Sequence, residues 1–429
     1  MKKFFVSFLL LAIFIFSLLG CGKKVSTKQS GDLSNNVGGE LNVAIWDKGQ
    51  EPGIRIILDD FTKATGIKTN LQVVTWESYW TLLEAGASGG DMPDVFWMHP
   101  NQAQKYMSNN ILLDITDMIK NSDIIEIDKF KKDILEMYTY EDKIYGIPKD
   151  IDTVALWYNK TMFDELGIPY PDETWTWDKF YKVAKQLTKE DGSQYGTAMS
   201  PSGNQEGYYN IIYSMGGSVI SDDKTKSELD SENTIKAMEF VQKLISDTMP
   251  SLDIISETPL DVLFSSGKVA MLNQGSWMVS LYKENEYVSK NCDVAIIPKN
   301  SDGKRVSMYN GLIWAASANT KNKEGALKLL EWFGSKDMQQ KQADLGVTMS
   351  AYEGLSENWA KSSNFNLEPY LEVLDSDKAE LVIKPYSKET VTWENSMIEN
   401  FKLIWENFIP VKEILQKATE DMNKILASE

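Results

Sequence analysis

Tryptophans stand at three places where the sequence predicts the edge of a sheet. Trp46 ends the first predicted strand, Trp97 ends the third, and Trp277 begins a helix directly after a strand. Ligands of α/β proteins bind at the carboxyl ends of strands, and an indole offers a flat apolar face with one donor at its edge. We expect these side chains, with Trp393 near a later helix start, to stack on a flat apolar face of a ligand. The alternative is packing in the core, the usual role of tryptophan.

Carboxylates near these tryptophans supply complementary acceptors. A hydroxyl donates well to an ionised carboxylate, and such a bond is stronger than a neutral one. The candidates are Asp47, Glu77, Asp150, Asp152 and Glu206. Because the chain holds 62 acidic residues, a solvated surface position is the alternative for each of them.

Residues 143–180 are predicted to position much of this site. A short strand is followed by Asp150 and Asp152, by the apolar run 154–158 and by a helix that Thr176 caps. A strand that leaves acidic and aromatic residues and enters a new α/β unit without a loop indicates a crossing between two lobes. We therefore expect the functional cleft at this crossing.

The segments before the crossing predict a parallel sheet. Apolar strands over residues 41–45, 71–75 and 94–98 alternate with helical periodicity over 54–61 and from residue 78. Strand, helix, strand, helix, strand is typical of a doubly wound α/β sheet with helices on its faces.

A series of motifs extends from the crossing into the second half of the chain. They are Tyr145-Gly146-Ile147-Pro148, Ala155-Leu156-Trp157-Tyr158-Asn159-Lys160, Phe163, Leu166-Gly167-Ile168, Thr176-Trp177-Asp178, Leu263 to Met271 and Gly275-Ser276-Trp277. Together they resemble the family 1 extracellular solute-binding proteins of bacterial ABC importers, the sugar-binding relatives of maltose-binding protein. The resemblance implies a two-lobed periplasmic-binding-protein-like fold. Each lobe would be a mostly parallel sheet flanked by helices, and a hinge of crossing strands would join the lobes.

The same resemblance implies how the chain divides. We expect lobe 1 over residues 40–150, with 310–349 returning to it. We expect lobe 2 over residues 151–309, with 350–429 returning to it.

The resemblance also implies the function and further site residues. It implies a non-catalytic monomer that captures a sugar or oligosaccharide and delivers it to the membrane subunits of an ABC permease. The loop Gln205-Glu206-Gly207-Tyr208 resembles a ligand-contacting loop of the family, which favours Glu206 and Tyr208. His99, after the third strand, and Asn310 with Gly311, at a second crossing, are further candidates.

Two other functions are consistent with the residues. A secreted carbohydrate-active enzyme would use a carboxylate pair such as Asp150 and Asp152. The same binding fold could instead hold a peptide or a polyamine, since an indole also accepts a cation on its face.

The N-terminus predicts export. Two lysines precede an apolar run over residues 4–19 that is too short to span a bilayer comfortably, which is typical of a secretory signal. Leu18-Leu19-Gly20-Cys21 resembles a lipobox. We predict a signal peptide over 1–20, a lipid on Cys21, a flexible polar tether over 21–39 and anchoring at the outer face of the cell membrane. An ordinary signal peptide or a membrane anchor is the alternative.

Composition disfavours several other classes. A net charge of −18 repels phosphate backbones, so nucleic acid is not an expected partner. One histidine and two cysteines are too few for a Cys/His zinc site and leave one imidazole for any Ser-His or Cys-His mechanism. We expect no metal and no cofactor.

Overall fold

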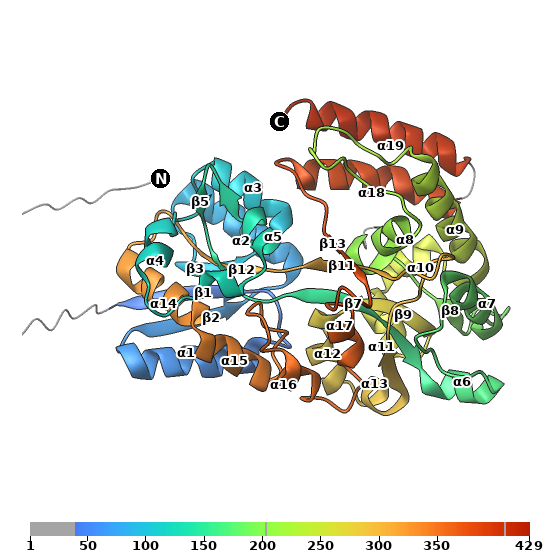
Figure 1. Cartoon of the computed structure of the whole chain (residues 1–429), viewed down its shortest axis with the longest axis horizontal. Helices are drawn as coiled ribbons and strands as arrows, with labels where there is room; N and C mark the ends of the chain where they lie inside the picture. Colours follow the sequence, from blue (N-terminus) through green and yellow to red (C-terminus); the bar gives the residue numbers. More distant parts are fainter. Residues whose placement is uncertain (1–38, 202–203, 407–408) are drawn as a thin grey trace, which may run out of the picture. The chain divides into compact units, whose positions relative to one another are not determined.

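The computed structural model describes residues 39–201, 204–406 and 409–429 (Figure 1). The predicted signal peptide, Cys21 and all of the tether before residue 39 lie outside the described residues. Within these ranges, every helix is too short or too polar to cross a bilayer. The same part of the chain has no group of three or more His, Cys, Asp or Glu side chains placed to hold a metal ion.

The first sheet contains the predicted parallel strands. Its order is β2 (Lys68–Val73), β1 (Glu40–Ile45), β3 (Val95–Met98), β12 (Ile313–Ala316) and β6 (Ile147–Pro148). β1 is parallel to β2 and β3, as the sequence predicts, whereas β12 is antiparallel to β3 and β6.

Alternating apolar side chains give this sheet a core on each face. On β12, Trp314 and Ala316 face one core, and Ile313 and Ala315 face the other. The first core is covered by α1 (Glu51–Thr65) and α14 (Lys323–Gly334), with α15 (Lys336–Asp344) beside α1. The second is covered by α2 (Trp76–Gly89), α3 (Pro100–Ser108) and α5 (Lys132–Met137).

The second sheet is mixed. Its order is β13 (Glu380–Ile383), β11 (Val306–Asn310), β7 (Asp152–Asn159), β9 (Val269–Gly275) and β8 (Tyr195–Thr197), and β10 (Cys292–Ala295) also pairs with β7. β7 is buried along its whole length and runs antiparallel to β9, β10 and β11. The expectation of a mostly parallel sheet is not met here, because β7 enters from the first sheet and β11 returns to it.

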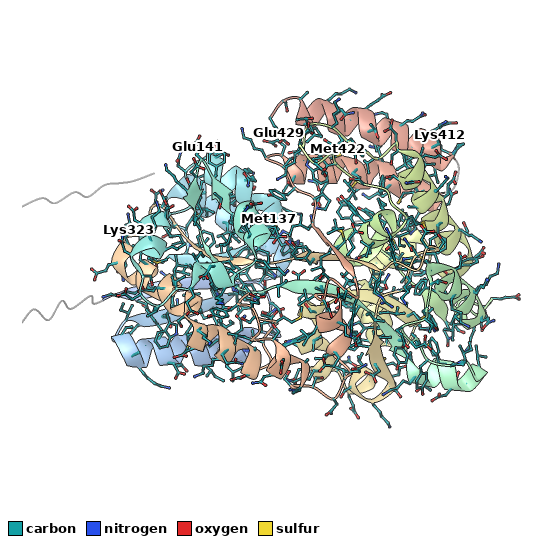
Figure 2. The ribbon with its side chains drawn as sticks, viewed as in Figure 1. Met137, Glu141, Lys323, Lys412, Met422 and Glu429 are labelled. Atoms are coloured by element: carbon teal, nitrogen blue, oxygen red, sulfur yellow. The ribbon has the colours of Figure 1, made fainter. Side chains whose placement is uncertain are left out.

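Helices cover both faces of the second sheet. One face packs against α7 (Trp177–Leu187), α8 (Tyr209–Ser214), α9 (Glu232–Thr248), α18 (Thr390–Glu406) and α19 (Val411–Leu426). The other packs against α11 (Leu260–Ser265), α12 (Val279–Glu284), α13 (Glu286–Asn291) and α17 (Glu368–Glu372). Thr176 caps α7 through its side chain, as predicted. Figure 1 shows α18 and α19 side by side, and Figure 2 labels Met422, which is buried in this core.

Short elements complete the described chain. They are α4 (Thr116–Asn121), α6 (Lys160–Leu166), α10 (Leu252–Glu257), α16 (Glu357–Ala360), β4 (Thr139–Tyr140), β5 (Lys143–Ile144), the 3-10 turns Ile127–Lys129 and Ser276–Met278, and the π-helical segment Asn204–Tyr208.

Two short crossings carry the chain between the sheets. Residues 149–151 join β6 to β7, and Gly311 with Leu312 joins β11 to β12. The crossings hydrogen-bond to each other: Lys149 N donates to the carbonyl of Leu312 at 2.8 Å, and Leu312 N donates to Asp150 Oδ1 at 2.8 Å. A methyl group at position 311 would lie 2.4 Å from the carbonyl oxygen of Asp150, so this approach requires glycine.

Candidate functional site

A cavity of about 570 Å³ lies between elements of the two sheets, within the range of about 300–1,000 Å³ that is usual for small-molecule sites. It is lined by Trp46, Asp47, Gln50, Trp76, Trp80, His99, Asn101, Gln102, Asp150, Asp152, Gln205, Glu206, Trp277, Asn310, Leu312, Lys384, Val391, Glu394, Asn395 and Ile398. The two crossings contribute Asp150 and Leu312, so the cavity lies where the sequence predicts the cleft.

One wall of the cavity is aromatic and comes from the first sheet. Trp46 follows the last residue of β1, and Trp76 and Trp80 lie one turn apart on α2, which places them on one helix face. Ring centroids are 5.1 Å apart for Trp46 and Trp76, 5.9 Å for Trp46 and Trp80, and 5.3 Å for Trp76 and Trp80. Trp76 is 40% exposed. The wall therefore offers apolar surface to a ligand.

A second aromatic layer supports this wall from beneath. Trp97 is completely buried, and its ring meets that of Trp46 edge to face at 5.1 Å. Lys149 Nζ lies 4.2 Å from the centroid of the Trp97 ring, a cation–π contact. Trp97 is outside the lining and holds Trp46 in place.

A chain of hydrogen bonds links the first crossing to the loop after β1. Lys149 Nζ contacts Asp150 Oδ2 at 2.6 Å and donates to Gln50 Oε1 at 2.9 Å. Gln50 in turn donates from Nε2 to Asp47 Oδ2 at 2.8 Å, while Gly49 N donates to Asp47 Oδ1 at 2.7 Å. Burial raises the pKa of Asp47. Both oxygens of Asp47 and of Asp150 are therefore engaged within the protein.

A different environment surrounds two other carboxylates. Asp152 begins β7 and is 6% exposed, and Gln205 Nε2 donates to its Oδ1. Burial, followed by the neighbouring charge of Asp150, holds the pKa of Asp152 well above its usual range. Glu206 lies in the π-helical segment 204–208, and burial raises its pKa too. Neither of these side chains makes a salt bridge within the described residues.

A buried ion pair closes the far side of the cavity. Lys384 Nζ lies 2.5 Å from Glu394 Oε1 on α18 and donates to Asn101 Oδ1 on α3 at 2.7 Å. Asn101 Nδ2 donates to Glu394 Oε2 at 2.5 Å, and Tyr209 Oη donates to Glu394 Oε1 at 3.4 Å. Because α3 belongs to the first sheet and α18 to the second, this network ties the two walls together.

Local geometry fixes three further lining residues. His99 caps α3, where its Nδ1 accepts from Asn101 N at 3.2 Å, and burial holds its pKa well below the usual range, so the ring is neutral. Trp277 lies over Gly275, where an added methyl group would be 1.9 Å from its Cζ3. Asn310 is 1% exposed, and its Oδ1 has no hydrogen-bond donor among the described residues.

The structure gathers eight of the predicted site residues in this cavity. They are Trp46, Asp47, His99, Asp150, Asp152, Glu206, Trp277 and Asn310. Their contact with a ligand stays a prediction.

Five predicted residues lie elsewhere. Glu77 is exposed on the first turn of α2. Trp97 is in the layer beneath Trp46. Tyr208 is buried against Phe401. Gly311 shapes the crossing, and Trp393 is completely buried and donates from Nε1 to Ser387 Oγ at 2.8 Å. In this conformation none of the five offers a surface to the cavity.

Several lining residues were missed by sequence reasoning. Trp76 and Trp80 carried a signal, since two tryptophans one turn apart at the start of a helix that follows a strand mark a helix face near the sheet edge. Lys384 and Asn101 carried none, because their roles arise from contacts between segments more than 280 positions apart.

Comparisons with known proteins identify the family of this chain. Residues 48–340 match the profile of the family described as bacterial extracellular solute-binding proteins. The galactooligosaccharide-binding protein of Bacillus subtilis is 26% identical over 343 residues, which cover 75% of this chain and 74% of the relative. The multiple sugar-binding protein of Streptococcus mutans is 22% identical over 348 residues, covering 77% and 78%.

A solved structure shows the same fold. An ABC substrate-binding protein of Listeria monocytogenes, in complex with cycloalternan, superposes with a TM-score of 0.82 at 22% identity and covers 90% of this chain and 99% of its own. The two-lobed periplasmic-binding-like fold expected from the sequence is confirmed. These relatives are named as binding proteins.

Proposed function

The chain belongs to the family of bacterial extracellular solute-binding proteins, and we propose that it captures a sugar or oligosaccharide in the cavity between its two sheets. One observation carries the proposal: a single cavity is lined both by indole rings, mostly from the first sheet, and by buried or half-buried carboxylates. A sugar ring presents an apolar face and hydroxyl donors at its edge, so both kinds of lining residue are complementary to it.

Binding would operate through closure of the two lobes. The aromatic wall belongs to elements of the first sheet, whereas Asp152, Glu206 and Trp277 belong to those of the second. A ligand that contacts both walls favours the conformation in which they approach, and only this difference in affinity can shift the equilibrium. The network of Lys384, Glu394 and Asn101 would then help hold the closed form.

We assign different roles to the predicted residues. Trp46 and Trp277, together with Trp76 and Trp80, would stack on the sugar. Asp152, Glu206 and Asn310 would accept from it, with Asp47, Asp150 and His99 shaping the floor. The lining residues would be held in place by four others: Trp97, Tyr208, Gly311 and Trp393. Glu77 would stay in solvent. We propose no catalytic step, because Asp150 has both oxygens engaged within the protein.

The remaining assignments concern the division of the chain into lobes and its place in a transport system. We propose that lobe 1 comprises 40–150 and 310–349, and lobe 2 comprises 151–309 and 350–429; the sheet membership of β1, β7, β11 and β12 supports this division. We also propose a monomer that is exported, anchored by a lipid on Cys21 at the outer face of the membrane, and delivers its ligand to an ABC permease.

A thermal-shift screen against mono- and oligosaccharides tests the proposal. A ligand selective for the folded state increases the free energy of unfolding by mass action, by about 2.7 kcal/mol at a hundredfold excess over Kd, and so raises the melting temperature. At least one sugar should stabilise the protein, and Trp277→Ala should abolish its shift. Trp405→Ala, in a partly buried ring outside the cavity, is the control. Stabilisation that Trp277→Ala leaves unchanged would contradict the site.

A further inference from the structure

We propose that the preferred ligand carries a protonated amine, so that this cavity selects an amino sugar whose ammonium group lies between Asp152 and Glu206. The inference rests on the proposed carbohydrate-binding function and narrows its substrate class.

The charges in the cavity are unevenly compensated. Asp150 has Lys149 at 2.6 Å, and Glu394 has Lys384 at 2.5 Å. Asp47 is held by backbone donors and by Gln50. Asp152 and Glu206, like Asp47, have no lysine or arginine within ion-pair distance among the described residues. Three donors hold Asp47, however, whereas Gln205 Nε2 is the one donor to the Asp152 carboxylate in this part of the chain. Asp152 is buried and Glu206 is half-buried. A carboxylate removed from water is costly unless a cation accompanies it, and in this cavity the missing cation can come from a ligand.

An independent observation places a third acceptor beside this pair. Asn310 is opposite Asp152 in the β11–β7 register, so the two side chains share one face of the sheet. Asn310 lines the cavity, and its buried Oδ1 has no donor among the described residues. An ammonium group brings three donors, whereas a hydroxyl brings one. Asp152, Glu206 and Asn310 supply three acceptors from three segments.

The surroundings favour a cation as well. Indole faces attract cations, and Trp46, Trp76 and Trp277 line the same cavity. Burial raises the pKa of both Asp152 and Glu206. The charge of Asp150 further raises the pKa of Asp152, and Lys149 lowers it. For Glu206, Lys384 lowers the pKa and Glu394 raises it. A bound ammonium group lowers the pKa of neighbouring carboxyls, so its binding should release protons to the solvent.

Matched sets of sugars test the proposal by titration calorimetry. Each set keeps one skeleton and changes position 2: glucose, glucosamine and N-acetylglucosamine; galactose, galactosamine and N-acetylgalactosamine; cellobiose with the free-amine and N-acetylated β-1,4 dimers. The free amine of at least one set should bind about tenfold or more tightly than its neutral parent. The N-acetylated form, which keeps the nitrogen but loses the charge, should not share the gain. Titrations in buffers of different ionisation enthalpy should show proton release for the amine alone.

Two variants and one control locate the effect. Asp152→Asn and Glu206→Gln should each reduce the preference for the amine by about tenfold. Glu77→Gln, which removes an exposed carboxylate outside the cavity, should leave it unchanged. Binding of neutral sugars without any preference for an amine would overturn this inference and leave the proposed function standing. Failure of every sugar in every form to bind would overturn both.

Discussion

Replacing Lys384 by methionine should destabilise the protein strongly, because it leaves a buried carboxylate without its cation. The side chains of Lys384 and Glu394 are 2% and 6% exposed, and their charged atoms are 2.5 Å apart. Methionine keeps the length of the stem and removes the ammonium group. Asn101 Oδ1 also loses the hydrogen bond that it accepts from Lys384 Nζ.

The magnitude follows from this burial. Removing one partner of a buried ion pair costs about 3–5 kcal/mol. Because this pair lines a cavity that water can enter, we expect a value near the lower limit, about 3 kcal/mol. Lys384→Met combined with Glu394→Gln removes the stranded charge as well, so the double variant should be less destabilised than the sum of the two single variants.

Urea unfolding followed by circular dichroism measures these differences, provided the slope of the transition is unchanged. Lys328→Met is the matched control, since Lys328 pairs with Glu324 at 3.1 Å and the two side chains are 43% and 60% exposed. Such exposed pairs contribute little. A loss for Lys384→Met no larger than that of Lys328→Met would refute the reasoning. So would a double variant whose loss equals the sum of the single losses.

Three other predictions concern the cavity. Gly275→Ala should displace the Trp277 ring, because the new methyl group would lie 1.9 Å from it; sugar affinity measured by calorimetry should fall up to about tenfold, whereas Gly89→Ala, with open space around it, should have no effect. His99 has a folded-state pKa below its unfolded value of about 6.5. Its contribution to stability should therefore be complete above that pH and decline below it, and NMR of this sole histidine should show a neutral ring at pH 6. Asp152 has a raised folded-state pKa, so stability from its neutral form is present at low pH and lost as pH rises through that pKa; Asp152→Asn should raise the melting temperature of the free protein at pH 7 and weaken sugar binding.

Strand ends explain which site residues could be predicted. β1 ends at Ile45, so Trp46 is the first residue beyond the hydrogen-bond ladder and is free to turn into the cavity. β3 continues to Met98, and Trp97 still pairs with Trp314. Relative to the strand end, Trp46 and Trp97 therefore differ by two positions, and this difference decides whether the ring lines the cavity or is buried. Apolar sequence does not define a strand end that closely.

The helices show a related limit. On α18 the cavity side carries Val391, Glu394, Asn395 and Ile398, which follow helical spacing but mix apolar and polar types. Trp393, which the sequence favours because it is aromatic, is not among them and is buried in the core. In the π-helical segment the backbone at Gly207 is not helical. Residue spacing therefore does not predict which way the side chains of this segment point. Tyr209 donates to Glu394 Oε1, whereas the Tyr208 ring packs against Phe401.

The order of elements was more predictable than the pairing of strands. Apolar strands alternating with helical periodicity indicated the parallel arrangement of β1, β2 and β3, and the residues between β6 and β7 indicated the crossing. The antiparallel pairing of β7 with β9 and β10 depends on segments more than 100 positions away. The local sequence of a strand does not indicate which distant strand it pairs with.

A crystal structure with the sugar that stabilises the protein most would test the central claim most directly. The account predicts a ring in the cavity with its apolar face on Trp46 or Trp277 and its polar edge within hydrogen-bond distance of Asp152 and Glu206. A sugar bound outside this cavity, or held by the elements of one sheet alone, would contradict it.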